Sequence, residues 1–197
     1  MATERRSQLS RATKETDVQV TLLLEGTGLS NISTGVGFLD HMLTSLAAHG
    51  RFDLDLQATG DLQVDCHHTV EDVASLLGEA IDEALGDRGG IERFGHAVIP
   101  MDESLASVAL DLSGRGLAVL RVTFPSPSVG GVPTSLINHF FEVLARSARI
   151  TLQLSAEGRD DHHLAEAMFK ATARSLRHAW QRDLNFQGQP PSTKGVL

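Results

Sequence analysis

The sequence of 197 residues is poor in cysteine and aromatic residues, with one cysteine, one tryptophan and no tyrosine. A single cysteine cannot form an internal disulfide, and so low a cysteine content is typical of a reducing compartment. No apolar stretch approaches the ~20 residues of a membrane-spanning helix. Residues 1–16 are polar and lack the apolar core of a signal peptide. We therefore expect a cytoplasmic protein that does not insert into a membrane.

Positive charge is also scarce. The chain has 25 acidic and 17 basic side chains, giving a formal net charge of −8 at pH 7. This balance argues against nucleic acid as a partner. A negatively charged small molecule would need a few arginines and lysines gathered in one place. Apolar residues make up an ordinary 41% of the chain, enough to bury a core without disulfides or a structural metal.

A histidine-rich motif occurs twice, at residues 67–71 and 162–166. On a helix, the first histidine and the glutamate of each motif share a face because they are four residues apart. The middle histidine is rotated from them by about 100° and cannot easily reach the same ion. One such motif is weak evidence, but two in one short chain indicate metal sites. The residues are His67, His68 and Glu71, and His162, His163 and Glu166.

The order of expected elements repeats as well. In the first half, after a charged surface lead-in at residues 5–15, we expect strands at 17–24, 52–57 and 62–64, helices at 38–48 and 67–85, and turns at 25–28 and 58–61. In the second half we expect strands at 103–111, 117–124 and 149–154, helices at 135–147 and 160–181, and a loop at 125–133. The sequence therefore predicts an α+β fold.

The two halves also align residue by residue. Residue 162 lies 95 positions after residue 67, and His139 lies 98 positions after His41. The difference of three falls in a turn, where the second half lacks a counterpart of strand 62–64. Chance similarity between apolar helices rarely aligns three histidines and a glutamate. We predict a tandem duplication, with repeats at residues 1–90 and 91–185 and a tail at 186–197.

The duplication indicates eight ligands for two metal sites. A lone histidine in an amphipathic helix is usually structural, so only their equivalence in the repeats supports His41 and His139. Helix geometry assigns one His/Glu pair to each site, and the middle histidine must then cross to the other site. One division is His67, Glu71, His139 and His163 at one metal, with His162, Glu166, His41 and His68 at the other.

Such ligands narrow the choice of metal. Three imidazoles and a carboxylate suit Mn(II), Fe(II), Ni(II) or Zn(II) better than Mg or Ca. An octahedral ion held this way keeps two positions open, as in a catalytic site.

Motifs along nearly the whole chain resemble the imidazoleglycerol-phosphate dehydratase family of histidine biosynthesis. They are Lys14-Glu15-Thr16, Phe38-Leu39-Asp40-His41-Met42-Leu43, His67-His68-Thr69-Val70-Glu71-Asp72, Pro100-Met101-Asp102-Glu103, Asp111-Leu112-Ser113-Gly114-Arg115, His139-Phe140-Phe141-Glu142, Asp161-His162-His163 and Pro191-Ser192-Thr193-Lys194-Gly195. The chain departs from the family at Gly116, where proline is usual, and at Cys66, where Asp or Ala is usual. Neither departure removes a ligand.

The resemblance implies a duplicated fold like domain 2 of ribosomal protein S5, in the monofunctional form. It implies dehydration of D-erythro-imidazoleglycerol phosphate to imidazole acetol phosphate and water, with two Mn(2+) ions per active site binding the imidazolate and no organic cofactor. It also implies a large homo-oligomer, a closed shell of 24 subunits built from trimers, in which ligands meet at subunit interfaces.

The resemblance assigns roles to further residues. Glu15 is the first candidate for proton transfer, and Glu71 and Glu166 follow because metal ligation lowers their basicity. Cations at family substrate-contact positions would bind the phosphate. The expected substrate contacts are Glu15, His41, His49, His67, Glu71, Arg93, Arg115, His162, Lys170, Ser192 and Lys194.

Two other classes of function fit the ligand set. A dinuclear metallohydrolase would use the same histidines and glutamates to activate water. A non-enzymatic protein assembled by metal would need the ligands but neither Glu15 nor the basic residues.

Overall fold

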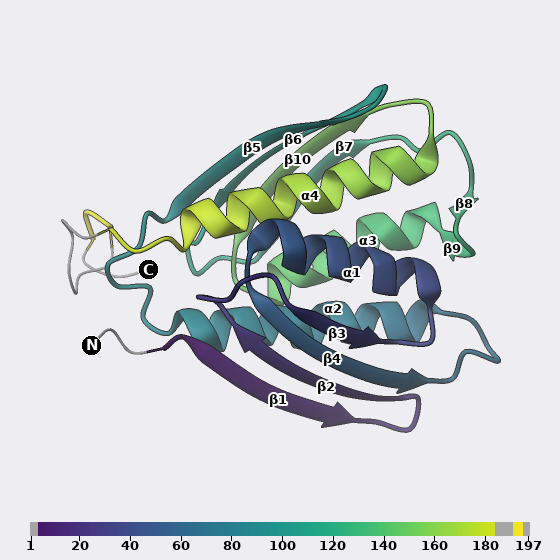
Figure 1. Ribbon diagram of the computed structural model, residues 1–197, viewed down its shortest axis with the longest axis horizontal. Helices are drawn as coiled ribbons and strands as arrows, with labels where there is room; N and C mark the ends of the chain where they lie inside the picture. Colours follow the sequence, from purple (N-terminus) through teal and green to yellow (C-terminus); the bar gives the residue numbers. More distant parts are fainter. Residues whose placement is uncertain (1–3, 184–190, 195–197) are drawn as a thin grey trace.

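A computed structural model describes residues 4–183 and 191–194. Over these residues the chain forms four helices and ten strands. Figure 1 shows two four-stranded sheets on the outside and the four helices between them. Helices α1 and α2 cover the first sheet, and α3 and α4 cover the second. In the middle of the molecule α1 packs on α4 and α2 packs on α3.

The first sheet and its helices come from the first half of the chain. The elements are β1 (Arg6–Ala12), β2 (Thr16–Leu23), β3 (Ser30–Ser33), α1 (Gly37–Gly50), β4 (Asp53–Gly60) and α2 (His67–Leu85). The strand order is β1-β2-β4-β3. β3 runs parallel to β4, and the other pairs are antiparallel.

The second half repeats this arrangement. Its elements are β5 (Phe94–Met101), β6 (Ser104–Asp111), β7 (Leu117–Val122), the small pair β8 (Ser128–Val129) and β9 (Val132–Pro133), α3 (Thr134–Ser147), β10 (Thr151–Glu157) and α4 (Asp161–Ala179). The strand order is β5-β6-β10-β7, with β7 parallel to β10. Both sheets thus share their order and their one parallel pairing, which confirms the expected duplicated α+β fold.

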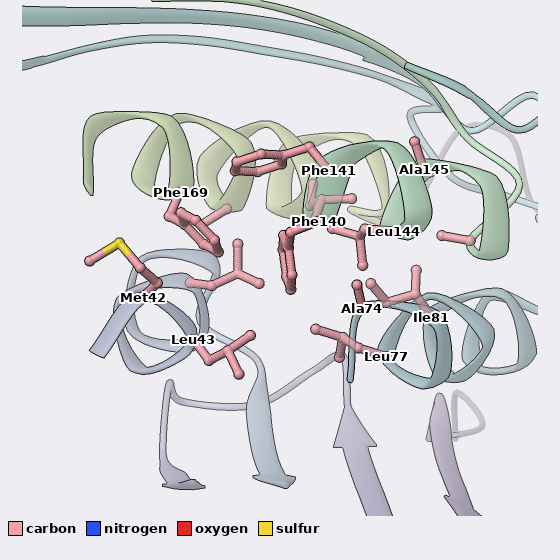
Figure 2. Packing of buried hydrophobic residues seen from close by; sticks show 14 of the residues in the cluster. Met42, Leu43, Ala74, Leu77, Ile81, Phe140, Phe141, Leu144, Ala145 and Phe169 are labelled. Atoms are coloured by element: carbon pink, nitrogen blue, oxygen red, sulfur yellow. The ribbon is translucent and has the colours of Figure 1, made fainter. Parts of the chain in front are cut away.

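Buried apolar side chains fill the space between each sheet and its helices, and also the space between the helices of the two halves. Strand β2 alternates, so that Val18, Val20 and Leu22 are buried against the helices. Phe140 of α3 is fully buried, and Figure 2 shows its ring directed between α1 and α2. Its ring centroid lies 5.1 Å from that of Phe169. Such packing leaves little room, and it fixes the positions of the helix ends that carry the histidines.

Helices α2 and α3 approach closely at Gly78. A Cβ atom added there would lie 2.6 Å from Cβ of Ser147 and 2.9 Å from the backbone nitrogen of Ala148. Only glycine fits at this distance. The contact holds α3 against α2, and therefore His139 of α3 near the histidines of α2.

Three local predictions were wrong. The lead-in at 5–15 contains β1, which pairs with β2 along its whole length. Residues 62–64 form a turn in place of a strand, with the Val64 amide donating to the Asp61 carbonyl at 2.8 Å. Strand β4 continues to Gly60, through most of the turn expected at 58–61. In addition β3 and β5 were not predicted, and β8 and β9 lie within the expected loop.

Candidate metal centres

Two clusters of side chains could each hold a metal ion. The first centre consists of His67 and Glu71 from α2 and His139 from α3. The second centre consists of His162 and Glu166 from α4 and His41 from α1. Within each cluster one nitrogen or oxygen from every member lies within 4.8 Å of the others.

In the first centre two imidazoles face one carboxylate. His67 Nε2 lies 3.4 Å from Glu71 Oε2, and His139 Nε2 lies 3.6 Å from Glu71 Oε1. The two imidazole rings stack with centroids 5.5 Å apart. Nε2 of His139 is buried and has no hydrogen-bond partner among the described residues. A buried nitrogen without a partner is costly, and a cation at this point would provide one, so these residues fit a metal ion.

The second centre repeats this geometry. Nε2 of His162 and Nε2 of His41 lie 3.5 and 3.8 Å from Oε2 of Glu166. Lys170 reaches the other oxygen, Oε1, at 2.8 Å. Burial raises the pKa of Glu166, but the hydrogen bond and charge of Lys170, together with the two histidines, outweigh burial and lower it. Glu166 is therefore held as a carboxylate, the form that binds metal.

The two repeats exchange a histidine. Each centre takes its His/Glu pair from one repeat and its single histidine from the other, because α2 packs on α3 and α4 packs on α1. The sequence-based division placed the same three residues together at each site. The exchange explains why neither repeat could form a centre alone.

His68 and His163 join neither cluster of the chain. Their rings lie nearly at right angles to those of His67 and His162, with interplanar angles of 82° and 88°. Nδ1 of His68 pairs with Asp61 Oδ2 and Nδ1 of His163 with Glu103 Oε2, each at 3.0 Å. A carboxylate on Nδ1 fixes the ring and leaves Nε2 available as a ligand.

These carboxylates also affect protonation. The hydrogen bond to Asp61 raises the pKa of His68, and the hydrogen bond to Glu103 raises the pKa of His163, against the smaller opposing effect of desolvation. From the sequence alone we did not identify Asp61 as a partner of a histidine. Glu103 was part of a family motif, but no role was assigned to it. The signal for Glu103 was its place in a family motif, whereas Asp61 lay in a stretch interpreted as a turn.

Glu15 lies in the turn between β1 and β2 and accompanies His68. Its Oε2 is 3.8 Å from Nε2 of His68, and its backbone carbonyl accepts the amide of Asp61 at 3.0 Å. The side chain is 55% exposed, so a substrate can reach it. Within one chain Glu15 therefore belongs with His68 and outside both centres.

A pocket of about 670 Å³ opens beside the first centre. His67, His139 and Cys66 line it together with the apolar Val36 and Leu136. Burial raises the pKa of the Cys66 thiol, in keeping with a small apolar residue. The pocket provides the first centre with open space on one side.

The sequence model of the family described as imidazoleglycerol-phosphate dehydratase matches residues 34–176. The chain belongs to this family. The enzyme of Methanothermobacter thermautotrophicus is 54% identical over 197 residues, and that of Gluconacetobacter diazotrophicus is 51% identical over 198 residues; each match covers all of both chains. Proteins of this name are hydro-lyases, and the chain is an enzyme of that kind.

Solved structures of the family have the same fold. The imidazoleglycerol-phosphate dehydratase of Staphylococcus aureus subsp. aureus N315 superposes with a TM-score of 0.82 at 34% identity, covering 90% of this chain and 99% of its own. The Pyrococcus furiosus protein, solved in complex with (S)-C348, gives 0.82 at 37% identity, covering 96% and 100%. No helix among the described residues is long and apolar enough to span a membrane.

The residues assigned to phosphate by the resemblance to imidazoleglycerol-phosphate dehydratase lie in two places. Arg93 and Arg115 both contact Asp111, with Nε of Arg93 at 2.7 Å from Oδ1 and Nη2 of Arg115 at 3.4 Å from Oδ2. The Arg115 side chain is 68% exposed and can reach a ligand. Lys170 lies elsewhere, on α4 between Glu166 and Met101.

The tail meets the arginine group. Nη1 of Arg93 donates to the Pro191 carbonyl at 2.7 Å, which places residues 191–194 beside it. Within that segment the Lys194 amide donates to Oγ of Ser192 at 3.2 Å. The rest of the expected tail, residues 186–190 and 195–197, lies outside the described residues.

His49 lies two helical turns beyond His41 on α1. Desolvation lowers the pKa of His49, and the neighbouring charge of Lys170 adds to the effect. The neutral imidazole is therefore the favoured form at neutral pH, which suits a hydrogen bond to substrate better than an ion pair with its phosphate.

Proposed function

We propose that the protein converts D-erythro-imidazoleglycerol phosphate to imidazole acetol phosphate and water in L-histidine biosynthesis, in the cytoplasm, with two Mn(2+) ions per active site. Membership of the imidazoleglycerol-phosphate dehydratase family supports the reaction. The observation that carries the two-metal site is the pair of equivalent clusters, each with two imidazoles and one carboxylate converging within 4.8 Å. Such ligands suit manganese and its neighbours in the first transition series.

His68 and His163 would complete the ligand sets from neighbouring subunits. Each has Nδ1 tied to a carboxylate, which leaves Nε2 as the nitrogen that can bind a metal, and neither reaches a centre of its own chain. A subunit interface is the simplest source of the fourth ligand. We accordingly propose a closed homo-oligomer of 24 subunits built from trimers, in which centres form where chains meet.

Glu15 would move with His68 to the shared site. The two side chains lie 3.8 Å apart, so any interface that brings His68 to a neighbour's centre also brings the Glu15 carboxylate. There Glu15 can accept the proton that leaves carbon and return a proton to the departing hydroxyl, which leaves as water. Glu71 and Glu166 are second choices because their oxygens already face the imidazoles of the centres.

When bound, the metal ions supply Lewis acidity and a template for the imidazole ring. The chain itself binds the rest of the substrate. Arg93, Arg115, Ser192 and Lys194 would bind the phosphate, and the Arg115 side chain is 68% exposed. Lys170 and His49 lie beside the second centre and would contact the polar glycerol chain or the phosphate from that side.

The experiment that tests this function is an assay of imidazoleglycerol phosphate with protein reloaded with Mn(II). We expect imidazole acetol phosphate to accumulate, and no turnover of simple phosphate esters or amides under the same conditions. Hydrolysis of those esters or amides without dehydration would favour a dinuclear metallohydrolase. Metal bound at two ions per chain without any turnover would favour a structural role.

A further inference from the structure

A pocket lined by arginines lies at the end of the molecule away from the metal centres. It has a volume of about 500 Å³ and lies where α1 and α4 end and β1 begins. In Figure 1 this is the end at which the chain starts, opposite β8 and β9. The charged residues that line it are Arg5, Glu25, Arg51, Arg177 and Arg182.

The pocket is lined by more positively charged side chains than negatively charged ones. Nε of Arg5 and Nε of Arg182 share one acceptor, Oε1 of Glu25, at 2.7 and 3.4 Å. The guanidinium groups of Arg51 and Arg177 have no hydrogen bond or ion pair with any described residue. Nη1 of Arg5 is buried and finds no acceptor in the same part of the chain. Arg51 and Arg177 therefore add two positive charges that have no acceptor among the described residues, in a chain whose net charge is −8.

Helix ends account for part of this surplus. Arg51 caps the C-terminus of α1 and Arg177 lies in the last turn of α4. Each helix C-terminus carries about −0.5 of a charge, so the two together offset about one positive charge. About one remains. Desolvation lowers the pKa of Arg177, and the neighbouring charges of Arg51 and Arg174 lower it further.

The duplicated half of the fold provides an internal comparison. The residue equivalent to Arg51 is Arg149, which also follows a helix end and also has a positive φ, 53° against 54°. Arg149 pairs with Asp82 at 3.6 Å, and the nearby Arg88 contacts the same carboxylate. The position equivalent to Asp82, 95 residues on, is Arg177. The pair of helices α2 and α3 thus neutralises its arginines, whereas the pair α1 and α4 has an arginine in place of the neutralising aspartate.

We propose that the arginine pocket binds a small phosphate-bearing anion, with Arg51 and Arg177 as its principal donors. A phosphate monoester carries −1.5 to −2 charges at neutral pH, opposite in sign to the guanidinium groups of the pocket. Arginine suits this role because its planar guanidinium can donate two parallel hydrogen bonds to phosphate. The volume is within the range of small-molecule sites. This site is independent of the metal centres and of the reaction proposed for them.

The test is calorimetric titration of metal-loaded protein with inorganic phosphate. We expect the double variant Arg51→Gln/Arg177→Gln to raise the Kd of this site at least tenfold. Arg121→Gln is the matched control, because it removes an exposed arginine of β7 that donates to Gln153 outside the pocket, and it should change the Kd less than twofold. Arg115→Gln should leave the pocket site in place, which separates it from phosphate binding at the proposed active site.

A second variant tests whether a loss of phosphate binding comes from misfolding. Arg177→Asp recreates the Asp82–Arg149 arrangement, so it should keep the thermal midpoint of the parent protein and still lose phosphate binding. Equal isotherms for the parent and the double variant would overturn the proposal, as would equal losses in Arg121→Gln. If light scattering shows a smaller particle for the double variant while phosphate affinity is unchanged, the pocket is a contact between subunits and the ligand site is refuted.

Discussion

Lys170 pairs with Glu166 across 2.8 Å, one helical turn along α4, and this pair has no counterpart at the first centre. The position equivalent to Lys170, 95 residues earlier, is Ser75, whose hydroxyl lies 3.3 Å from that of Ser147. Glu71 therefore faces its histidines without a lysine. The two centres have equal ligands but unequal electrostatics.

We expect the first centre to bind Mn(II) more tightly than the second, because Lys170 competes with the ion for Glu166 and repels it. Lys170→Met should tighten the second centre about tenfold, which is about 1.4 kcal/mol. Ser75→Lys is the mirror variant and should weaken the first centre. Titration with electron paramagnetic resonance of free Mn(II) measures both. If the two centres bind Mn(II) with the same affinity and neither variant changes it, the predicted difference between the centres is wrong.

The ligand assignment predicts the effect of removing one histidine. His67→Ala and His162→Ala should each lower bound metal and abolish dehydration, because each takes one nitrogen from a centre. His96→Ala is the control, since this exposed histidine of β5 lies against His178 and outside both clusters. Metal analysis and turnover should be normal for it. Full metal content and normal turnover in either ligand variant would contradict the assignment.

Glu15→Gln separates proton transfer from binding. The variant keeps the shape of the side chain, so metal content and particle size should not change, whereas kcat should fall by about 10²- to 10⁴-fold. Arg115→Ala provides the contrast, because an exposed phosphate contact made equally in the ground and transition states should mainly raise KM. Steady-state kinetics distinguish the two. A normal kcat for Glu15→Gln would move the proton-transfer role to another group.

The hydrogen bonds of Asp53, which lies outside both metal centres, should make the stability of the fold depend on pH. Its Oδ1 accepts the backbone amides of Thr27, Gly28 and Leu29 at 2.8, 3.0 and 2.9 Å. Burial raises the pKa of Asp53, but these donors together outweigh burial and lower it. A lowered folded-state pKa stabilises the fold above the ordinary value of about 3.9, and that stability is lost as pH falls through the folded-state value.

Asp53→Asn should therefore lower the free energy of unfolding by about 1 kcal/mol at pH 7, and the gap to the parent protein should close below about pH 4. Urea unfolding of metal-free protein at pH 7 and pH 3 measures this without a contribution from metal loss. Asp55→Asn is the neighbouring control, because among the described residues that carboxylate accepts hydrogen bonds only from the side-chain amides of Asn31 and Gln57. A gap that stays constant with pH would exclude the proposed cause.

The sequence predicted which histidines and glutamates lie together better than it predicted the strands. Helical spacing and the internal repeat were enough to group His67, Glu71 and His139, since both depend on local geometry that survives folding. Strand β1 was missed because its inward side chains include Ser7 and Arg11, which break the apolar alternation expected of a strand.

The contact between the turn after β4 and the start of α2 could not be predicted in the same way. The pairing of His68 with Asp61 depends on how the turn after β4 folds back, and the sequence carries no periodic signal for it. The pairing of Lys170 with Glu166 did have a signal, their spacing of four on one helix. The interpretation of Lys170 as a phosphate contact came instead from its match to a substrate-contact position of the family.

The most direct measurement is a titration of Mn(II) into fully stripped protein, with turnover of imidazoleglycerol phosphate and particle mass followed in the same samples. Metal that binds where subunits meet must favour assembly, because the ion binds the assembled state far better than the separated chains. We predict that stripped protein is inactive and small, with the mass of trimers. As Mn(II) is added, activity and particle mass should rise together and saturate at two ions per chain. Full turnover without metal, saturation at one ion per chain, or a mass unchanged between stripped and reloaded protein would contradict this prediction.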